Sequence, residues 1–420
     1  MILGFTQLLI ISAITFYEFK NRSSSVFLWA SLLVMFGLMH FVSYFLPDYI
    51  YEDVLDQASI FAILFCAVYF VTRVMLSMFV RREKDLIYAS TRYEDRFIRI
   101  SKILLLISVL AYGGYLVRTG GSLLRLSKET VYLTMAKSSK FFLLSTYCYY
   151  SSAPVFIYCM LQKRRKDALY FALLVAARSL LSNTRMDMMV IFVGIIAYII
   201  FNSDRNLFIK LLILAISGII TIFMIYSLRV FRYYYGIKNL GSINASDFFG
   251  YLGNFLRNDD GELGLRRVFY FFLENNNEFP GFGTGNGYKR VLLFMIPGSL
   301  LGGLKPEDMC VVMGRAWRPN LTSIIGFTIT PTLFGDCYAN LGFSGFLLGI
   351  FWGVVVTVLD AIVNRKSELM RTLLFGMTAI EYVDIGRGSV YNPICHIWYC
   401  SIIVYFMYIF SAKVRFKIKH

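Results

Sequence analysis

Long apolar runs alternate with short charged segments along almost the whole chain. A helix needs about 20 apolar residues to cross a bilayer, and fewer where the membrane is thin. The pattern therefore predicts an all-α, polytopic integral membrane protein. We expect about eleven spanning helices, at residues 2–18, 26–46, 58–80, 101–118, 141–161, 168–182, 186–202, 207–228, 337–363, 370–385 and 391–411.

Two of these runs, 168–182 and 186–202, are separated by only three residues, Asn183 to Arg185. They could form a tight helical hairpin or one long, interrupted helix. The sequence leaves both arrangements open.

Composition agrees with a membrane protein. The chain is 57% hydrophobic and 16% charged, whereas soluble domains carry about 25% charged residues. A net charge of +16 would suggest nucleic acid for a soluble protein, but here we expect membrane lipid and no nucleic acid as a partner. The three histidines form no ligand cluster, so we expect no metal and no cofactor.

Charge sets the expected orientation. Basic residues gather in loops 81–102, 162–167 and 365–371 and in the tail 413–419, whereas loop 47–57 carries only acidic charges. With eleven spans, all of the basic segments fall on one side, which the positive-inside rule makes cytoplasmic. The N-terminus is then outside and the C-terminus cytoplasmic.

The same orientation places one large loop outside the membrane. The expected divisions are an N-terminal bundle of eight spans at 1–228, the extracytoplasmic loop at 229–336 and a C-terminal bundle of three spans at 337–420. Within the loop, the apolar segment 291–301 is too short to span and is predicted to be re-entrant or interfacial. The glycine-rich stretch 281–287 resembles a phosphate loop only superficially and is expected to be a flexible turn.

Basic residues on the outer side gain nothing from the orientation rule, and charges close to the membrane indicate a functional site by default. An arginine fork suits phosphate because it binds two oxygens at once. Snorkelling to the interface and solvated loop charge are the alternative explanations. The anion-binding candidates are Arg178, Arg185, Arg387, Lys305, Arg315 and Arg318.

Two of these candidates have local features that favour an anion. Arg185 lies where a short outer turn meets a helix N-terminus, which itself attracts anions. Arg387 lies between Gly386 and Gly388, which permit close approach of the backbone to a ligand.

Three motifs occur in a fixed order on the predicted outer face. They are SNTRMDMMVIF around Arg185, Ile296-Pro297 followed by Leu304-Lys305-Pro306-Glu307, and GDCYANLGFSG from Gly335 to Gly345. Together they resemble the Wzy-type O-antigen and oligosaccharide repeat-unit polymerases over residues 170–400. The family often has Arg where this chain has Gly298, Glu where it has Asp336 and Phe where it has Leu341.

The resemblance implies a glycosyltransferase at the outer face of a bacterial inner membrane. Such an enzyme transfers a growing glycan from undecaprenyl diphosphate onto a lipid-linked repeat unit. The expected partners are the lipid-linked donor and acceptor, with a chain-length regulator protein as a further one. The implied fold plan is shared with O-antigen ligases and GT-C glycosyltransferases.

The implied reaction needs a base for the acceptor hydroxyl. Asp336 is the leading carboxylate, beside Tyr338 and Asn340, which can hydrogen-bond a sugar, although Asp at this place could instead cap the helix. His396 is a weaker candidate base. We therefore expect Asp336 and Arg185 to be catalytic, and Tyr338 and Asn340 to bind substrate with the basic residues.

Two other functions share the expected features. An O-antigen ligase uses the same donor, but such ligases usually have a histidine in the outer loop, and none occurs here between His40 and His396. A flippase or transporter of lipid-linked oligosaccharides would share a cationic cavity, but internal symmetry is not visible.

Overall fold

The structure of this protein is a computed structural model. It describes residues 1–45, 52–79, 91–118, 139–182, 185–202, 245–257, 263–296, 298–320, 327–364 and 367–413, together with the single positions 212, 216, 223, 227 and 230. Every regular element in these ranges is a helix, which confirms the all-α prediction for this part of the chain.

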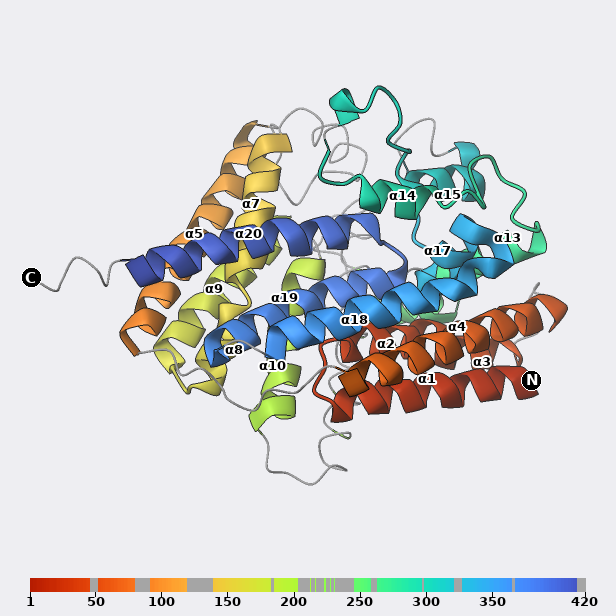
Figure 1. The fold of residues 1–420 in the computed structure, drawn as a ribbon, viewed down its shortest axis with the longest axis horizontal. Coiled ribbons are helices and arrows are strands. Elements are labelled where there is room, and N and C mark those ends of the chain that lie inside the picture. Colours follow the sequence, from red (N-terminus) through yellow and green to blue (C-terminus); the bar gives the residue numbers. More distant parts are fainter. Residues whose placement is uncertain are drawn as a thin grey trace, which may run out of the picture. The chain divides into compact units, whose positions relative to one another are not determined.

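The described helices follow one another along the chain (Figure 1). They are α1 (Ile2–Lys20), α2 (Val26–Leu32), the π-helix η1 (Leu33–Leu38), α3 (Met39–Ser43), α4 (Glu52–Phe79), α5 (Thr91–Arg118), α7 (Ser139–Ser152), α8 (Val155–Leu161), α9 (Arg165–Ser182), α10 (Arg185–Asn202), α12 (Ala245–Arg257), α13 (Leu265–Glu274), α14 (Asn286–Leu292), the 3-10 helix η3 (Gly298–Leu300), α15 (Met309–Trp317), α17 (Thr332–Leu341), the 3-10 helix η4 (Gly342–Leu347), α18 (Leu348–Asn364), α19 (Glu368–Arg387) and α20 (Tyr391–Lys413).

Six helical segments within the described ranges are long and apolar enough to cross a membrane. They are Ile2–Lys20, Val26–Ser43, Glu52–Phe79, Tyr93–Arg118, Thr332–Asn364 and Tyr391–Ala412. These helices indicate a multi-pass membrane protein. The expected count of about eleven stays a prediction, since the run 207–228 lies almost wholly outside the described residues.

The chain forms two compact units, each assembled from three stretches of sequence. The first unit contains Met1–Asp85, Gly261–Arg365 and Glu381–Ile397, and the second contains Leu86–Asp260, Lys366–Ile380 and Trp398–His420. The sequence suggested other boundaries, at 228 and 336, which separate two bundles of spanning helices from one large loop. Contacts between residues do not test that division, which stays a prediction.

In the first unit, α4 packs along both α1 and α18 (Figure 1). Two glycines of α18 make the close approach to α4. A Cβ at Gly349 would lie 2.6 Å from the carbonyl oxygen of Phe65, and one at Gly353 would lie 2.9 Å from the side chain of Thr72. Small residues let helix backbones approach closely inside a membrane, so these positions fix the α4–α18 interface.

A π-helical turn separates α2 from α3 and positions a buried histidine. His40 Nδ1 is 2.5 Å from the hydroxyl of Tyr270, and its Nε2 is 2.7 Å from Ser59 Oγ. The ring also stacks on Phe36, which belongs to the π turn, at a centroid distance of 5.0 Å. Both ring nitrogens therefore have a partner, as a buried imidazole requires.

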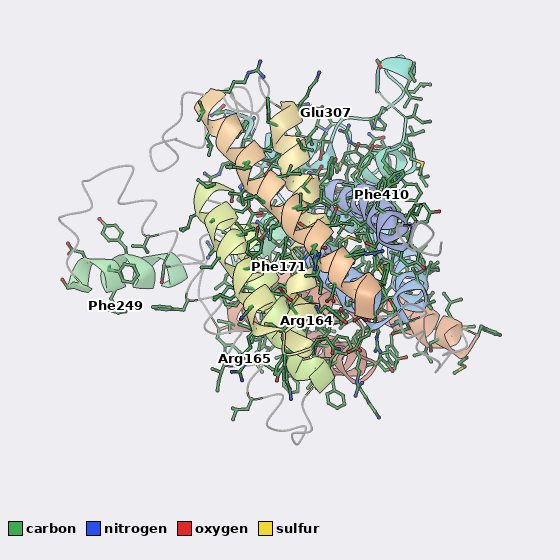
Figure 2. All side chains as sticks on the ribbon, turned by 90° about the vertical axis from the view of Figure 1, so that its left-hand side faces the viewer. Arg164, Arg165, Phe171, Phe249, Glu307 and Phe410 are labelled. Carbon is green, nitrogen blue, oxygen red and sulfur yellow. The ribbon has the colours of Figure 1, made fainter. Side chains whose placement is uncertain are left out.

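In the second unit, α5 packs along α7 and α9, and α9 packs against α10. The helical hairpin is therefore the arrangement adopted at residues 165–202. At the turn before α9, Arg164 (labelled in Figure 2) pairs with Asp95 of α5 at 2.5 Å. Nearby, Lys102 pairs with Asp167 at 2.5 Å.

Candidate functional site

Asp336 lies inside α17, in the first unit. Its helix begins four residues earlier at Thr332, so Asp336 is not the helix cap. The residue is 3% exposed, and its Oδ2 makes no hydrogen bond to any residue that the structure describes. Buried polar atoms are almost always paired, and the group that comes nearest to this role for the Asp336 carboxyl is the hydroxyl of Tyr288.

Aromatic and thiol groups surround this carboxylate. The hydroxyl of Tyr288, in α14, is 3.4 Å from Cys337 Sγ and accepts a hydrogen bond of 3.2 Å from Trp352 Nε1. Burial raises the pKa of Tyr288 well above its usual value, with a further contribution from Cys337 and Asp336. Tyr288 therefore stays a neutral hydrogen-bonding group beside Asp336 at physiological pH.

The start of α15 brings a second carboxylate to the same region. Asp308 caps this helix by accepting a 2.9 Å hydrogen bond from the backbone N–H of Cys310. Burial raises the pKa of the Cys310 thiol, and the negative charges of Asp308, Asp336 and Asp384 add to the shift. Three carboxylates from α15, α17 and α19 thus lie within electrostatic range of one thiol.

Cations approach the same carboxylates from α14 and from the loop before α15. Arg290 Nε is 4.0 Å from Asp308 Oδ2, and the Arg290 guanidinium lies 4.4 Å from the centroid of Tyr391. Lys305 Nζ lies 5.6 Å from the same ring. Two cations therefore lie close to the ring of one tyrosine at the start of α20, and two neighbouring positive charges attract an anion.

Arg290 makes one hydrogen bond among the contacts described here, besides its ion pair with Asp308 and its contact with Tyr391. Its Nη1 donates a 2.6 Å hydrogen bond to the carbonyl of Pro306. Its Nε is buried and makes no hydrogen bond within the described part of the chain. Sequence reasoning did not select Arg290, because its nearest aromatic partner, Tyr391, is a hundred positions away along the chain.

The other predicted cations of this unit differ in their partners. Lys305 donates to the carbonyl of Ile296 at 3.2 Å. Arg315 is exposed and pairs with Glu307 (labelled in Figure 2) at 2.7 Å. Arg387 pairs with Asp384 of its own helix at 3.1 Å. The partner of Arg387, Asp384, is one of the three carboxylates that act on the Cys310 thiol.

Arg318 and the two glycines beside Arg387 are the remaining predicted features of this unit. Arg318 directly follows α15 and is exposed. A Cβ at Gly386 would lie 2.0 Å from Ser31 Oγ, and a Cβ at Gly388 would lie 2.6 Å from the carbonyl oxygen of Thr332. The close approach at these glycines is therefore to the protein itself, whereas the sequence had favoured a ligand.

Asn340, predicted to bind sugar, is fully buried, and its side chain links α17 to the start of α14. Its Oδ1 accepts a 2.7 Å hydrogen bond from the N–H of Gly287, and its Nδ2 donates to the carbonyl of Asp336 at 2.9 Å. Tyr338 packs edge-on against Phe61 and Phe269 at centroid distances of 5.6 Å. Both residues support α17 from within the packed interior.

The glycine-rich stretch 281–287 docks on the end of α17. The N–H of Gly283 donates to the carbonyl of Ala339 at 2.7 Å, and the N–H of Gly285 donates to that of Asn340 at 2.6 Å. The last carbonyls of a helix lack partners within it. A turn is present at 281–285 and leads into α14 at Asn286. Its two N–H groups satisfy the end of the helix that carries Asp336, and the flexibility expected from the sequence stays a prediction.

In the second unit, Arg178 is buried, and its guanidinium contacts other side chains of the protein. Its Nη1 is 2.8 Å from Asp187 Oδ2, and its Nε donates to Ser145 Oγ at 2.9 Å. The guanidinium also lies 3.9 Å from the ring centroid of Tyr112 and 5.6 Å from that of Tyr149. A carboxylate, a hydroxyl and two aromatic faces thus surround the predicted anion-binding residue.

Two further candidates complete the account. Arg185 is the first residue of α10, and its side chain lies outside the described part of the chain, so its role stays a prediction. His396 Nδ1 is 3.3 Å from Glu381 Oε1, in the first unit. This pair joins α19 to α20 near Asp384, which acts electrostatically on both residues.

Comparison with known proteins adds no relative. No protein-family model, no curated protein and no solved structure matches this chain.

Proposed function

We propose that this protein is a membrane glycosyltransferase that polymerises lipid-linked oligosaccharide repeat units. The growing glycan is transferred from undecaprenyl diphosphate onto a second lipid-linked unit at the outer face of the inner membrane. The ordered motifs around Arg185, Lys305 and Asp336 support this assignment, as do the six candidate spanning helices.

One observation carries the proposal. Two buried polar atoms of opposite charge, Asp336 Oδ2 and Arg290 Nε, both make no hydrogen bond within the described residues. Asp308 connects them, because it lies 4.0 Å from Arg290 and within electrostatic range of Asp336. An acceptor oxygen and a donor N–H that both lack a close hydrogen bond within the described residues suit a substrate that carries both a hydroxyl and a phosphate.

The roles follow from the charges. The acceptor hydroxyl donates its proton to Asp336 while its oxygen attacks the anomeric carbon of the donor glycan. The bond from that carbon to the phosphate oxygen breaks, and the electron pair leaves with undecaprenyl diphosphate. Arg290 and Lys305 stabilise the negative charge that grows on the diphosphate. Arg387 is a further proposed diphosphate ligand in the first unit, and the catalytic role of Arg185 stays the prediction made from its motif.

The test uses cells that lack this gene and carry a plasmid copy. Wild-type protein is expected to give a ladder of surface polysaccharide on a gel. Asp336→Asn and Arg290→Ala are expected to reduce the ladder to a single repeat unit, since removal of a general base costs about 10²- to 10⁴-fold in rate and removal of a group that stabilises the developing negative charge costs about 10²- to 10³-fold. The matched control is Lys289→Ala, which removes the exposed neighbouring cation and should keep the ladder.

Immunoblots must show equal protein levels for all variants. A full ladder in both Asp336→Asn and Arg290→Ala would refute the assignment of this site. Long chains that accumulate on the lipid carrier in the deletion strain would indicate a ligase instead. Single units trapped on the cytoplasmic side would indicate a flippase.

A further inference from the structure

An apolar arm leaves the first unit between α14 and α15. We define the arm as residues 292–296 and 298–304, which contain no charged residue and a single polar side chain, that of Ser299. In Figure 1 the arm is the teal segment that rises away from α14 and α15 at the top of the picture, and Figure 2 shows the same projection after a quarter turn. The arm is therefore a distinct projection of this unit.

Large aliphatic side chains of the arm are exposed. Leu292, Leu300 and Leu304 are 78%, 77% and 76% exposed, and Met295 and Ile296 are exposed as well. A cluster of exposed apolar side chains beside polar residues marks a contact with a protein or a membrane. The arm lies outside the six candidate spanning helices, so the lipid-facing side of a span does not account for this exposure.

The backbone of the arm pairs many of its own polar groups. Four N–H groups each donate to the carbonyl three residues earlier, at 2.9 to 3.2 Å, and they belong to Phe294, Ile296, Leu301 and Leu304. Lys305 Nζ donates to the carbonyl of Ile296 at 3.2 Å and lies 3.5 Å from that of Phe294. Lipid offers no hydrogen bonds to a backbone. Internal pairing therefore makes this irregular segment compatible with a water-poor surrounding.

Two cations cross the base of the arm. Arg290, before the arm, donates to the carbonyl of Pro306 beyond it at 2.6 Å, and Lys305, after the arm, donates back to Ile296. Both cations also lie near the ring of Tyr391, which is the first residue of the candidate span Tyr391–Ala412. Tyrosine at the end of a span is typical of the membrane–water interface. The base of the arm is therefore level with one end of a spanning helix.

A bilayer that contains anionic lipid fits this combination of groups. Segments that lie in a membrane surface bury leucine side chains about 5–10 Å into the boundary between headgroups and acyl chains, and their Lys and Arg attract anionic lipids. The arm is too short for a span of about 20 residues, so its insertion stays within this boundary. A second copy of the chain would cover the leucines but would leave the two cations without an anion.

We propose that the arm is a membrane anchor. Leu292, Leu300 and Leu304 enter the boundary of one leaflet, and Arg290 and Lys305 lie at the level of the lipid phosphates. This contact holds α14 and α15 at the membrane surface beside the start of α20. The inference rests on the exposure, the backbone pairing and the cations of the arm, and it does not depend on the proposed glycosyl transfer.

Quenching by brominated lipid tests the insertion. Full-length protein is placed in nanodiscs of phosphatidylcholine and phosphatidylglycerol, with acyl chains that are brominated or unbrominated. Leu300→Trp adds one fluorophore to the four native tryptophans, and its signal is the difference from the wild type. Brominated chains are expected to reduce this added signal at least about twofold, because the inserted side chain reaches the acyl boundary. The control is Glu278→Trp, at an exposed charged position in the turn after α13, whose added signal should persist.

Leu304→Trp repeats the measurement at a second exposed position, should Leu300→Trp fail to fold. Quenching at these positions that does not exceed that of Glu278→Trp would overturn the proposal. Wild-type protein gives an independent readout, since a phospholipid with a photoactivated carbene group in its acyl chain should label peptides from the arm. Labels on the spanning helices with none on the arm would also overturn it. Cross-links between the arms of two copies would show that a second copy covers this surface instead.

Discussion

The buried ion pair between Arg178 and Asp187 gives the sharpest prediction for stability. We choose Arg178→Met, which keeps an unbranched side chain of similar length and removes the charge. The substitution leaves Asp187 with Ser182 as its side-chain hydrogen-bond donor among the described residues. Its carboxylate would then be a buried charge with no counterion within ion-pair distance among the residues that the structure describes.

The magnitude follows from the burial of the pair. The side chains of Arg178 and Asp187 are 3% and 5% exposed, so solvent does little to screen them. Breaking such a pair by removing one partner costs about 3 to 5 kcal/mol. The lost contact of the guanidinium with Tyr112, at 3.9 Å, adds about 0.5 to 2 kcal/mol.

The assay is a double-mutant cycle on the full-length protein, unfolded by denaturant in mixed micelles. Asp187→Leu alone should also be destabilising, because it leaves the Arg178 charge buried. The double variant should recover most of the loss, since replacing a buried pair by apolar groups is often neutral. A loss below about 1 kcal/mol for Arg178→Met, or a double variant no more stable than either single variant, would refute this reasoning.

Two further predictions concern the first unit. Gly345→Ala should destabilise the protein by about 1 to 3 kcal/mol or more, because its Cβ would lie 2.2 Å from the backbone carbonyl oxygen of Cys337. Gly113→Ala, with no atom within 4 Å of the new Cβ, should not lower the melting temperature, and equal losses in the two variants would contradict the packing argument. The raised pKa of Cys310 predicts slow maleimide labelling at neutral pH that speeds up as the pH rises. Asp308→Asn should lower this pKa and accelerate labelling, as read by peptide mass spectrometry, and an unchanged rate would contradict the role of Asp308.

The helical class could be predicted from the sequence because apolar runs long enough to span a membrane almost always form helices. The runs that became α1 and α20 were located to within two residues at each end, whereas α4 begins six residues before the run expected at 58–80. The run expected at 337–363 is more complex, since the span starts earlier and contains α17, η4 and α18. Apolar character alone does not reveal such breaks, which depend on where Gly342 and Gly345 allow the backbone to turn.

The candidate site was only partly readable. Lys305 and Asp336 were selected by motif, and both lie in the cluster of the first unit. The pairing of Arg290 with Tyr391 joins segments a hundred positions apart, and nothing local in the sequence signals it. The buried contacts of Arg73 with Glu18 and Asp360 left a signal that was not used: opposite charges inside or at the ends of apolar runs, which normally pair with one another.

The π turn at Leu33–Leu38 also changes how the second span must be interpreted. A π turn takes up one residue more than an α turn, and one residue corresponds to about 100° of rotation around a helix axis. A helical wheel drawn through Val26–Ser43 at a constant angle would therefore place His40 on the wrong face. The face that His40 presents to Ser59 and Tyr270 is set by this single shift in phase, so the buried stripe of the span turns by about 100° around the helix axis partway along it.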